Sequence, residues 1–337
     1  MDKKILFSLR GVKKYFPLKK ESVFQKEQLF VRANEDINID IYQGETLGLV
    51  GESGCGKSTL GRTLLQLYPA TEGEILYYGD DPTGENPVDL TKLSKEQIRK
   101  MRKDLQLIFQ DPYSSLNPRM TVGQIISEGL RSHNIFEKHD EVSQAYTLDV
   151  MNKCGLAPYF VHRYPHQFSG GQRQRIGIAR SVALKPKFIV ADEPVSALDV
   201  SIQSQIINLL LDLKEQENLT YLFISHDLSV IKYISDRVGV MYLGHIVELT
   251  DTAKLFAHPM HPYTEALLEA IPTIDVENKK KIKILEGDIP SPVNPPVGCK
   301  FHTRCVYATD ICREVMPAML ELEPGHFVAC HHPLGMR

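Results

Sequence analysis

The stretch "GESGCGKST", from Gly51 to Thr59, has the residue types and the spacing that hold a phosphate chain. A short apolar run precedes it and a helical pattern begins at Lys57, so we expect a strand, a loop and the start of a helix. Glycines let backbone N–H groups converge on phosphate oxygens, while Lys57 supplies a charge and Ser58 a hydroxyl ligand for Mg²⁺. The predicted phosphate-binding residues are Gly51, Ser53, Gly54, Cys55, Gly56, Lys57, Ser58 and Thr59.

A second apolar run, "KFIVADE", ends in two carboxylates. It predicts a buried strand that closes with Asp192, where a carboxylate can meet Mg²⁺ directly or through water. Glu193 follows at once and is placed to orient or deprotonate an attacking water. Together with the phosphate loop (Gly51–Thr59), this pair indicates nucleotide hydrolysis.

A second glycine-rich helix start lies upstream of that strand, in "SGGQ". Ser169, Gly170, Gly171 and Gln172 precede a segment that carries its apolar residues on one side, which predicts a helix. Such a helix N-terminus is another potential anion site. Because one nucleotide does not need two such sites, we predict that each serves a different nucleotide across a dimer.

The composition indicates which cellular compartment and which partners the protein is expected to have. The 337 residues carry a net charge of −3, which gives no basic excess for a nucleic acid, and their number suffices for an α/β core plus a smaller domain. The N-terminus lacks the apolar core of a secretory signal, and no apolar run approaches membrane-spanning length. We therefore predict a soluble, cytosolic protein without a nucleic-acid partner.

Four of the six cysteines lie near the C-terminus: Cys299, Cys305, Cys312 and Cys330. In a reducing compartment, clustered cysteines more often bind metal than form disulfides. The spacing lacks the close Cys pair of structural zinc sites, whereas iron–sulfur clusters tolerate more variable spacing. An iron–sulfur cluster, zinc and unligated thiols all stay open. We expect "HTRCVYATDICREV" to form a short helix that carries both Cys305 and Cys312.

Other segments position these groups. Ile37, Ile39 and Ile41 alternate and predict an antiparallel strand, while residues 119–158 have a helical period. Residues 17–28 are polar and predict a mobile insertion. Two short helices are expected after the strand "HIVEL". Cys55 and Cys154 are expected to be small buried residues, and the following histidines to be surface or capping residues rather than ligands: His258, His261, His326, His331 and His332.

Residues 5–250 resemble the ATP-binding cassette of ABC transporters, because every diagnostic element occurs in order. The loop at Gly51 matches Walker A, "FSGGQRQR" the signature (with Phe168 where Leu is commoner), "FIVADE" Walker B and "SALD" the D-loop that ends at Asp199. Gln110 in "IFQDP" matches the Q-loop, and His226 in "FISHD" the switch histidine. Phe16 in "VKKYF" matches the aromatic residue that stacks on adenine.

The resemblance implies an α/β P-loop NTPase fold: a RecA-like core, an antiparallel β-subdomain and a helical subdomain that carries the signature. It implies an ATPase in which two cassettes sandwich two ATP molecules. Glu193, His226 and Gln110 would be catalytic: Gln110 would sense Mg²⁺ and the γ-phosphate beside the membrane partner, and His226 would hold the γ-phosphate and the water. Asp192 and Asp199 would belong to the ATP site.

The chain after the cassette resembles the C-terminal domain of oligopeptide and dipeptide importer ATPases, through "HPYTEALLEAIP" and "GDIPSPVNPPVGC". We expect a cassette over 1–255 and this C-terminal domain over 256–337. The amino-acid sequence of the cassette resembles that of the F-type subunit of these importers. The resemblance implies a [4Fe–4S] site on the four cysteines, with zinc as the alternative. It also implies a second, non-identical ATPase, two permease subunits and an extracytoplasmic peptide-binding protein, at the cytoplasmic face of the membrane.

Rival functions differ in what they require. DNA-repair ABC ATPases carry long coiled-coil insertions, translation-associated members carry two cassettes, and exporters are usually fused to membrane helices. A non-hydrolysing binder would lack Glu193 or His226, and both are present. The alternatives that stay open are a related importer for another substrate, such as nickel, and a soluble ABC ATPase.

Overall fold

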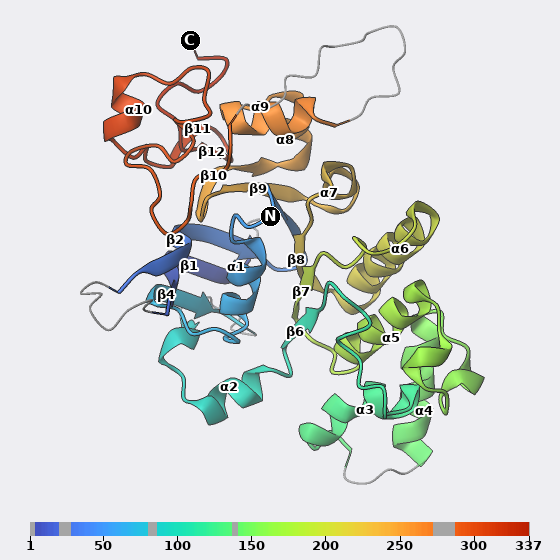
Figure 1. Ribbon diagram of the computed structural model, residues 1–337. Coiled ribbons are helices and arrows are strands. Elements are labelled where there is room, and N and C mark those ends of the chain that lie inside the picture. Colours follow the sequence, from blue (N-terminus) through green and yellow to red (C-terminus); the bar gives the residue numbers. More distant parts are fainter. Residues whose placement is uncertain (1–3, 20–27, 80–85, 137–140, 272–286, 337) are drawn as a thin grey trace, which may run out of the picture. The chain divides into compact units, whose positions relative to one another are not determined.

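The computed structural model describes residues 4–19, 28–79, 86–136, 141–271 and 287–336. They form two compact units, each discontinuous in the sequence (Figure 1). Unit 1 comprises residues 1–6, 42–46 and 78–224, and unit 2 comprises residues 7–41, 47–77 and 225–337. The predicted boundary between 255 and 256 does not coincide with this division and stays a prediction. The insertion expected at residues 17–28 lies largely outside the described residues.

Unit 1 contains a parallel set of three strands in the order β8-β7-β6. The strands are β6 (Leu105–Ile108), β7 (Phe188–Asp192) and β8 (Thr220–Ile224). Every residue of β7 and β8 is buried, which explains their continuous apolar runs. The predicted strand that ends at Asp192 is therefore confirmed.

Helices make up most of the rest of unit 1 (Figure 1). They are α2 (Lys95–Met101), α3 (Val122–Ser132), α4 (Glu141–Lys153), α5 (Gly170–Val182) and α6 (Val200–Glu217). Three short 3-10 turns, at Leu90–Lys92, Pro158–Phe160 and Pro165–Gln167, and the short strand β5 (Val88–Asp89) accompany them. Helices α3 and α4 confirm the helical period predicted for residues 119–158, and α3 packs against both α4 and α5.

Unit 2 contains two strand groups. The first has the order β2-β1-β4, with β1 (Ile5–Pro17), β2 (Phe30–Tyr42) and β4 (Glu72–Tyr77). The second has the order β11-β12-β10-β9-β3, with β3 (Thr46–Val50), β9 (Arg237–Tyr242), β10 (His245–Asp251), β11 (Leu320–Glu323) and β12 (His326–Val328). Ile37, Ile39 and Ile41 are all buried on β2, which confirms the predicted alternation.

Five helices complete the described part of unit 2: α1 (Lys57–Leu64), α7 (Leu228–Ile234), α8 (Thr252–Ala257), α9 (Pro262–Glu269) and α10 (Asp310–Glu314). Helices α8 and α9 confirm the two short helices expected after "HIVEL". Strand β12 of the C-terminal domain pairs antiparallel with β10 at Glu248↔Val328. The domain thus extends the sheet that the cassette begins, a connection that the sequence did not indicate.

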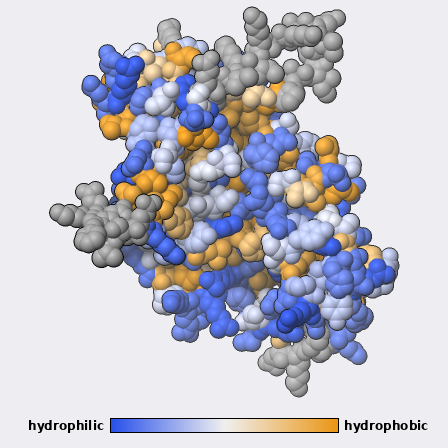
Figure 2. Space-filling view, viewed as in Figure 1, coloured by the Kyte–Doolittle hydropathy of each residue, from blue (hydrophilic) through white to orange (hydrophobic). Residues whose placement is uncertain are grey.

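The prediction that one helix carries both Cys305 and Cys312 is wrong. Helix α10 has five residues and includes only Cys312, while Cys305 lies in the turn before it. Thr309, at the N-cap position, has φ −118° and ψ 179°, an extended conformation that separates the turn from the helix. The C-terminal domain also leaves apolar side chains exposed, as a small domain with little core does (upper left of Figure 2). They include Val297, Val306, Ile311, Val315 and Leu320.

Candidate ATP site and cysteine cavity

The backbone of the phosphate loop requires glycine at its two ends. Gly51 has φ +147°, and a Cβ there would lie 2.1 Å from the Met241 carbonyl oxygen. Gly56 has φ +108°, and a Cβ there would lie 2.0 Å from the Ala33 carbonyl oxygen. Since strand β3 ends at Val50 and α1 starts at Lys57, this loop places the helix N-terminus directly after the strand. That is the strand–loop–helix context predicted for phosphate binding.

Lys57 is buried at the start of α1, with 5% of its surface exposed. Its Nζ donates to the carbonyl oxygens of Gly51, at 2.7 Å, and Glu52, at 3.1 Å. The ammonium therefore lies inside the loop, where phosphate oxygens can compete with the two carbonyls. Cys55 is buried beside it, and burial raises the pKa of its thiol, so it is the small buried residue that was predicted.

The rest of the loop is more accessible. Ser53 and Gly54 are exposed, and Ser58 and Thr59 are half-buried in the first turn of α1. Phe16 lies on β1, half-buried, with its ring edge-on to Tyr68 at 5.3 Å between centroids. His226 is exposed just before α7. These positions leave the predicted roles of Phe16 in adenine stacking and His226 in γ-phosphate contact as predictions.

Two predicted catalytic residues of unit 1 meet in the structure. The Gln110 amide Nε2 donates to Glu193 Oε2 at 2.9 Å, although the residues are far apart in the sequence. Glu193 follows buried Asp192 and has φ +47°, a left-handed conformation that is unfavourable for a glutamate. Its backbone N–H donates to the Ile224 carbonyl at 3.0 Å. The strained backbone and the amide together orient the carboxylate that is predicted to act on water.

The signature residues form a capped helix start. Ser169 is the N-cap of α5: its Oγ accepts from the Gln172 N–H, and the Gln172 side chain accepts from the Ser169 N–H. This capping box fixes the helix N-terminus that was predicted. A Cβ at Gly171 would lie 2.5 Å from Ile202 Cγ2, so glycine is required for packing there. Gly170 opens the helix, and Asp199 stands at the N-cap position of α6.

The four C-terminal cysteines line one small cavity in unit 2, together with histidines that include His302 and His332. Its volume is about 10 Å³, enough for about one water molecule. The Cys299 N–H donates to the Cys312 carbonyl at 2.8 Å, which joins two cysteine segments. Burial, assisted by the neighbouring thiols, raises the pKa of Cys330 to about 12. The described residues nonetheless contain no set of three or more His, Cys, Asp or Glu in metal-binding geometry.

Comparison with known proteins finds two family matches. Residues 34–196 match the ABC transporter family, and residues 247–312 match the C-terminal region of oligopeptide/dipeptide transporters. The oligopeptide transport ATP-binding protein AppF of Bacillus subtilis is 52% identical over 336 residues, which cover 98% of each chain. A putative oligopeptide transport ATP-binding protein of the same organism, YkfD, is 53% identical over 89% of each chain. The chain belongs to the oligopeptide ABC transporter ATP-binding family.

Solved structures confirm the cassette fold of this oligopeptide-family ATPase. A dimeric ATP-binding cassette, MJ0796, bound to ADP and Pi in a post-hydrolysis state, has a TM-score of 0.63 and 27% identity. The match covers 73% of this chain and 99% of that one. Within the described ranges, no helix of the family member combines the length and the apolar character needed to cross a membrane.

Of the histidines predicted to be surface or capping residues, His261 is a capping residue, as predicted, and His326 is neither. His261 and His326 are fully buried, with 1% and 0% exposure. His261 caps α9 through its Nδ1, and His326 lies 2.7 Å from the carboxylate of buried Glu248. Glu248 also accepts the backbone N–H groups of Met260 and His261. It thus ties β10 to β12 and to the start of α9. A charged residue inside the apolar strand "HIVEL" was the signal that sequence reasoning missed.

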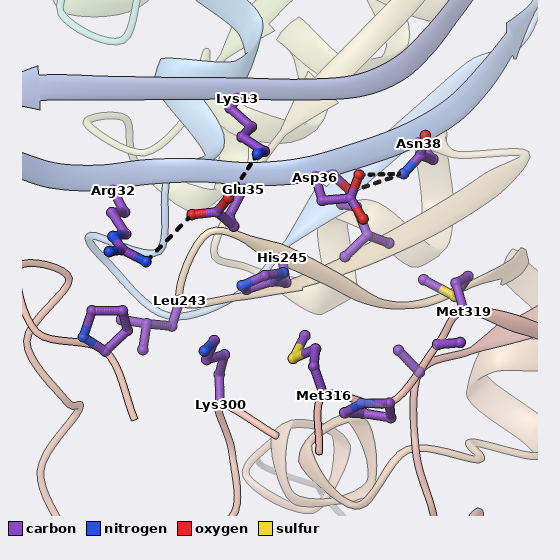
Figure 3. Close-up of a pocket in the computed structure, with 15 residues that line it drawn as sticks. Lys13, Arg32, Glu35, Asp36, Asn38, Leu243, His245, Lys300, Met316 and Met319 are labelled. Carbon is purple, nitrogen blue, oxygen red and sulfur yellow. Dashed lines mark hydrogen bonds and ion pairs between the residues drawn. The ribbon is translucent and has the colours of Figure 1, made fainter. Parts of the chain in front are cut away.

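A separate cavity of about 560 Å³ lies in unit 2 beside β1, β2, the β9–β10 turn and the C-terminal domain (Figure 3). His245 and Lys300 line it from different elements. Lys300 donates to the Pro296 carbonyl at 2.7 Å, and burial lowers the pKa of His245 to about 4, so this imidazole is neutral near pH 7. Among the described residues that line this cavity, none belongs to the phosphate loop.

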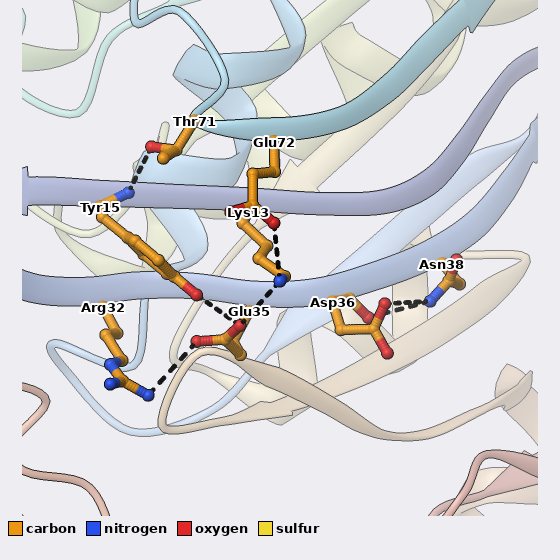
Figure 4. Close-up of polar contacts among 8 residues, drawn as sticks. All are labelled: Lys13, Tyr15, Arg32, Glu35, Asp36, Asn38, Thr71 and Glu72. Carbon is orange, nitrogen blue, oxygen red and sulfur yellow. Dashed lines mark hydrogen bonds and ion pairs between the residues drawn. The ribbon is translucent and has the colours of Figure 1, made fainter.

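The charged groups on the sheet side of this cavity are paired with one another (Figure 4). Lys13 Nζ lies 2.8 Å from Glu72 and 3.8 Å from Glu35. Arg32 lies 4.0 Å from the other oxygen of Glu35, and the Tyr15 hydroxyl also donates to Glu35. The network joins β1, β2 and β4, so it stabilises the β-subdomain.

Proposed function

We propose that this chain is the ATP-hydrolysing subunit of a membrane complex that imports oligopeptides or dipeptides. The observation that carries the proposal is the likeness to AppF over 98% of both chains, which spans the cassette and the C-terminal domain together. A soluble ABC ATPase or an importer of another substrate, such as nickel, is the alternative outcome of the tests below.

In this proposal the phosphate loop binds the ATP phosphates, and the carboxylate that follows β7 acts on the attacking water. Lys57 binds the β- and γ-phosphates, and Ser58 and Gln110 contribute ligands to Mg²⁺, which neutralises phosphate charge when it is bound. Glu193 orients or deprotonates the water. The Gln110 amide donates to the Glu193 carboxylate at 2.9 Å and holds that carboxylate in place. His226 holds the γ-phosphate, and Phe16 stacks on adenine.

The signature helix is proposed to contact the nucleotide of a second cassette. Ser169, Gly170, Gly171 and Gln172 offer the capped N-terminus of α5 to an anion, which one nucleotide bound at Lys57 does not require. The second cassette is proposed to be a non-identical ATPase subunit. Two permease subunits and an extracytoplasmic peptide-binding protein complete the complex, with this chain on the cytoplasmic face of the membrane.

We further propose that Cys299, Cys305, Cys312 and Cys330 bind a metal centre. The donor set supports this, because four thiols line one cavity. A [4Fe–4S] cluster is the form that the family resemblance implies. Zinc is the alternative. The centre would stabilise a small domain with little core.

The hydrolysis proposal is tested with Glu193→Gln in the complex reconstituted with its permeases and partner ATPase. We expect peptide-stimulated ATP hydrolysis to fall by about 100-fold or more, because the variant lacks the group that acts on water, while ATP binding persists. Near wild-type turnover in the variant would remove Glu193 from its role. Full ATPase activity without permeases, stimulated by DNA or ribosomes, would favour the soluble alternative.

The metal proposal is tested by anaerobic purification followed by iron, sulfide and zinc analysis. We expect near-equal iron and sulfide, and their loss in Cys305→Ser. Zinc in stoichiometric amount without iron would replace the cluster with zinc. Protein that carries neither metal would show the cysteines to be unligated thiols.

A further inference from the structure

Glu52, the second residue of the phosphate loop, is held at three points. Its carboxylate accepts from both terminal nitrogens of Arg304, at 2.6 and 3.1 Å. Its backbone N–H donates to the Tyr263 hydroxyl at 2.8 Å, and its carbonyl accepts from Lys57 Nζ at 3.1 Å. Two of its partners, Arg304 and Tyr263, come from the C-terminal domain.

Arg304 is itself fixed in place. It immediately precedes Cys305, its backbone N–H donates to the Phe301 carbonyl at 3.0 Å, and only 5% of its side chain is exposed. Its guanidinium lies 6.0 Å from the ring of Tyr242, in a cluster where Tyr242, Tyr263 and Phe301 pack against one another at 4.7 to 5.4 Å. A planar, two-pronged pair of this kind sets both the position and the orientation of the carboxylate.

The Arg304–Glu52 pair matters for phosphate binding because Glu52 is charged and lies in the phosphate loop. A carboxylate in a phosphate loop repels the phosphates of a nucleotide unless a cation neutralises it. The Glu52 side chain is 25% exposed, so solvent screens it only in part. Its carbonyl also holds the Lys57 ammonium, and a displaced Glu52 would therefore move the cation that the phosphates need.

We propose that Arg304 is a positioning residue for ATP, through which the C-terminal domain sets the nucleotide affinity of the phosphate loop. The proposal rests on the ATP-binding role of that loop. It predicts that Arg304 acts through Glu52, so that the harm done by losing Arg304 depends on the carboxylate being present.

The experiment measures Mg-ATP affinity of the full chain by calorimetric titration. We expect Arg304→Ala to weaken binding by about fivefold or more, a coupling of ordinary size between two contacting elements. Glu52→Gln alone should bind within about threefold of wild type, and the double variant should regain most of the affinity lost in Arg304→Ala. Arg304→Lys, which keeps the charge but not the two-pronged geometry, should be intermediate and serves if the alanine variant does not fold.

Arg313→Ala is the matched control, because this arginine pairs with Asp310 at 3.4 Å on the exposed surface of the same domain. It should leave ATP affinity unchanged. In the reconstituted complex, Arg304→Ala should raise the KM for ATP and leave kcat near wild type, the pattern of lost uniform binding.

Unchanged affinity in Arg304→Ala and Arg304→Lys would overturn the proposal. So would a double variant that binds as weakly as Arg304→Ala, because Arg304 would then act as a general support of the fold. A wild-type chain that does not bind Mg-ATP would instead contradict the proposed function, which separates the two failures.

Discussion

The phosphate loop and the C-terminal domain are neighbours in unit 2, yet they are held in shape by different means. The loop depends on its backbone, since Gly51 and Gly56 adopt conformations and approaches that no side chain tolerates. The C-terminal domain has little regular structure and depends on side-chain contacts, such as that of buried His326 with Glu248 of the adjoining strand β10 and the packing of the four cysteines around their cavity. Substitutions should therefore damage the loop through steric clashes and backbone strain. In the C-terminal domain they should do so by leaving buried polar groups unpaired.

The largest effect is expected at Gly56, where the backbone argument is strongest. In Gly56→Ala the new Cβ would meet the Ala33 carbonyl at 2.0 Å and the residue would be strained at φ +108°. We expect Mg-ATP affinity to fall by roughly 100-fold, measured by calorimetric titration. Gly54→Ala is the control: φ is also positive there, but nothing lies within 4 Å of the new Cβ, so the loss should be much smaller.

The second effect tests the side-chain argument at Glu248. In Glu248→Ala, His326 and two backbone N–H groups lose a buried acceptor, so we expect the free energy of unfolding to fall by about 3–5 kcal/mol. Urea unfolding followed by circular dichroism measures it. Glu321→Ala removes an exposed carboxylate that accepts from Gly325 in the C-terminal domain and should cost about 1 kcal/mol or less. Equal losses in the two variants would contradict the importance of the buried group.

The third effect concerns pH and His245, which lies on the strand that carries the C-terminal domain. Burial, and then the charge of Lys300, lowers the folded-state pKa of His245 to about 4, below its unfolded value of about 6.5. The unfolded chain therefore binds more protons between these values. Stability from this group is complete above about pH 6.5 and declines as the pH falls toward 4, by up to about 3 kcal/mol. Urea midpoints of His245→Gln should decline less over that window than those of wild type.

The two regions also differ in what the sequence could predict. Steric and phosphate requirements are local, so the spacing of Gly51, Gly56 and Lys57 was sufficient to predict the strand, the loop and the helix. The same holds for the helix that starts after Ser169 and for the buried strand that ends at Asp192. Contacts between distant residues have no local pattern. Gln110 with Glu193, Arg304 with Glu52, and the pairing of β12 with β10 each join segments that only the folded chain brings together.

The cysteine segment shows where a spacing argument fails. Cys305 and Cys312 are seven residues apart, as on one face of a helix, and that spacing predicted a helix through both. The extended backbone at Thr309 divides the segment, and a turn and a short helix place the two cysteines at one cavity instead. Spacing constrains which residues can meet in a helix, but it does not establish that the helix forms.

The smallest effect is expected at Gly325, which has a positive φ like the glycines of the phosphate loop but lies in the C-terminal domain. Gly325, in the turn between β11 and β12, has φ +72°, but nothing lies within 4 Å of the position that a Cβ would take, in contrast to Gly56. Gly325→Ala should therefore cost only the left-handed strain, about 1 kcal/mol in the free energy of unfolding. Gly325→Asn should cost less, because asparagine tolerates this conformation. Urea midpoints measure both variants, with ATP affinity expected to stay at the wild-type value. A loss of several kcal/mol in Gly325→Ala would contradict the expectation that a left-handed glycine with open space around it tolerates a Cβ.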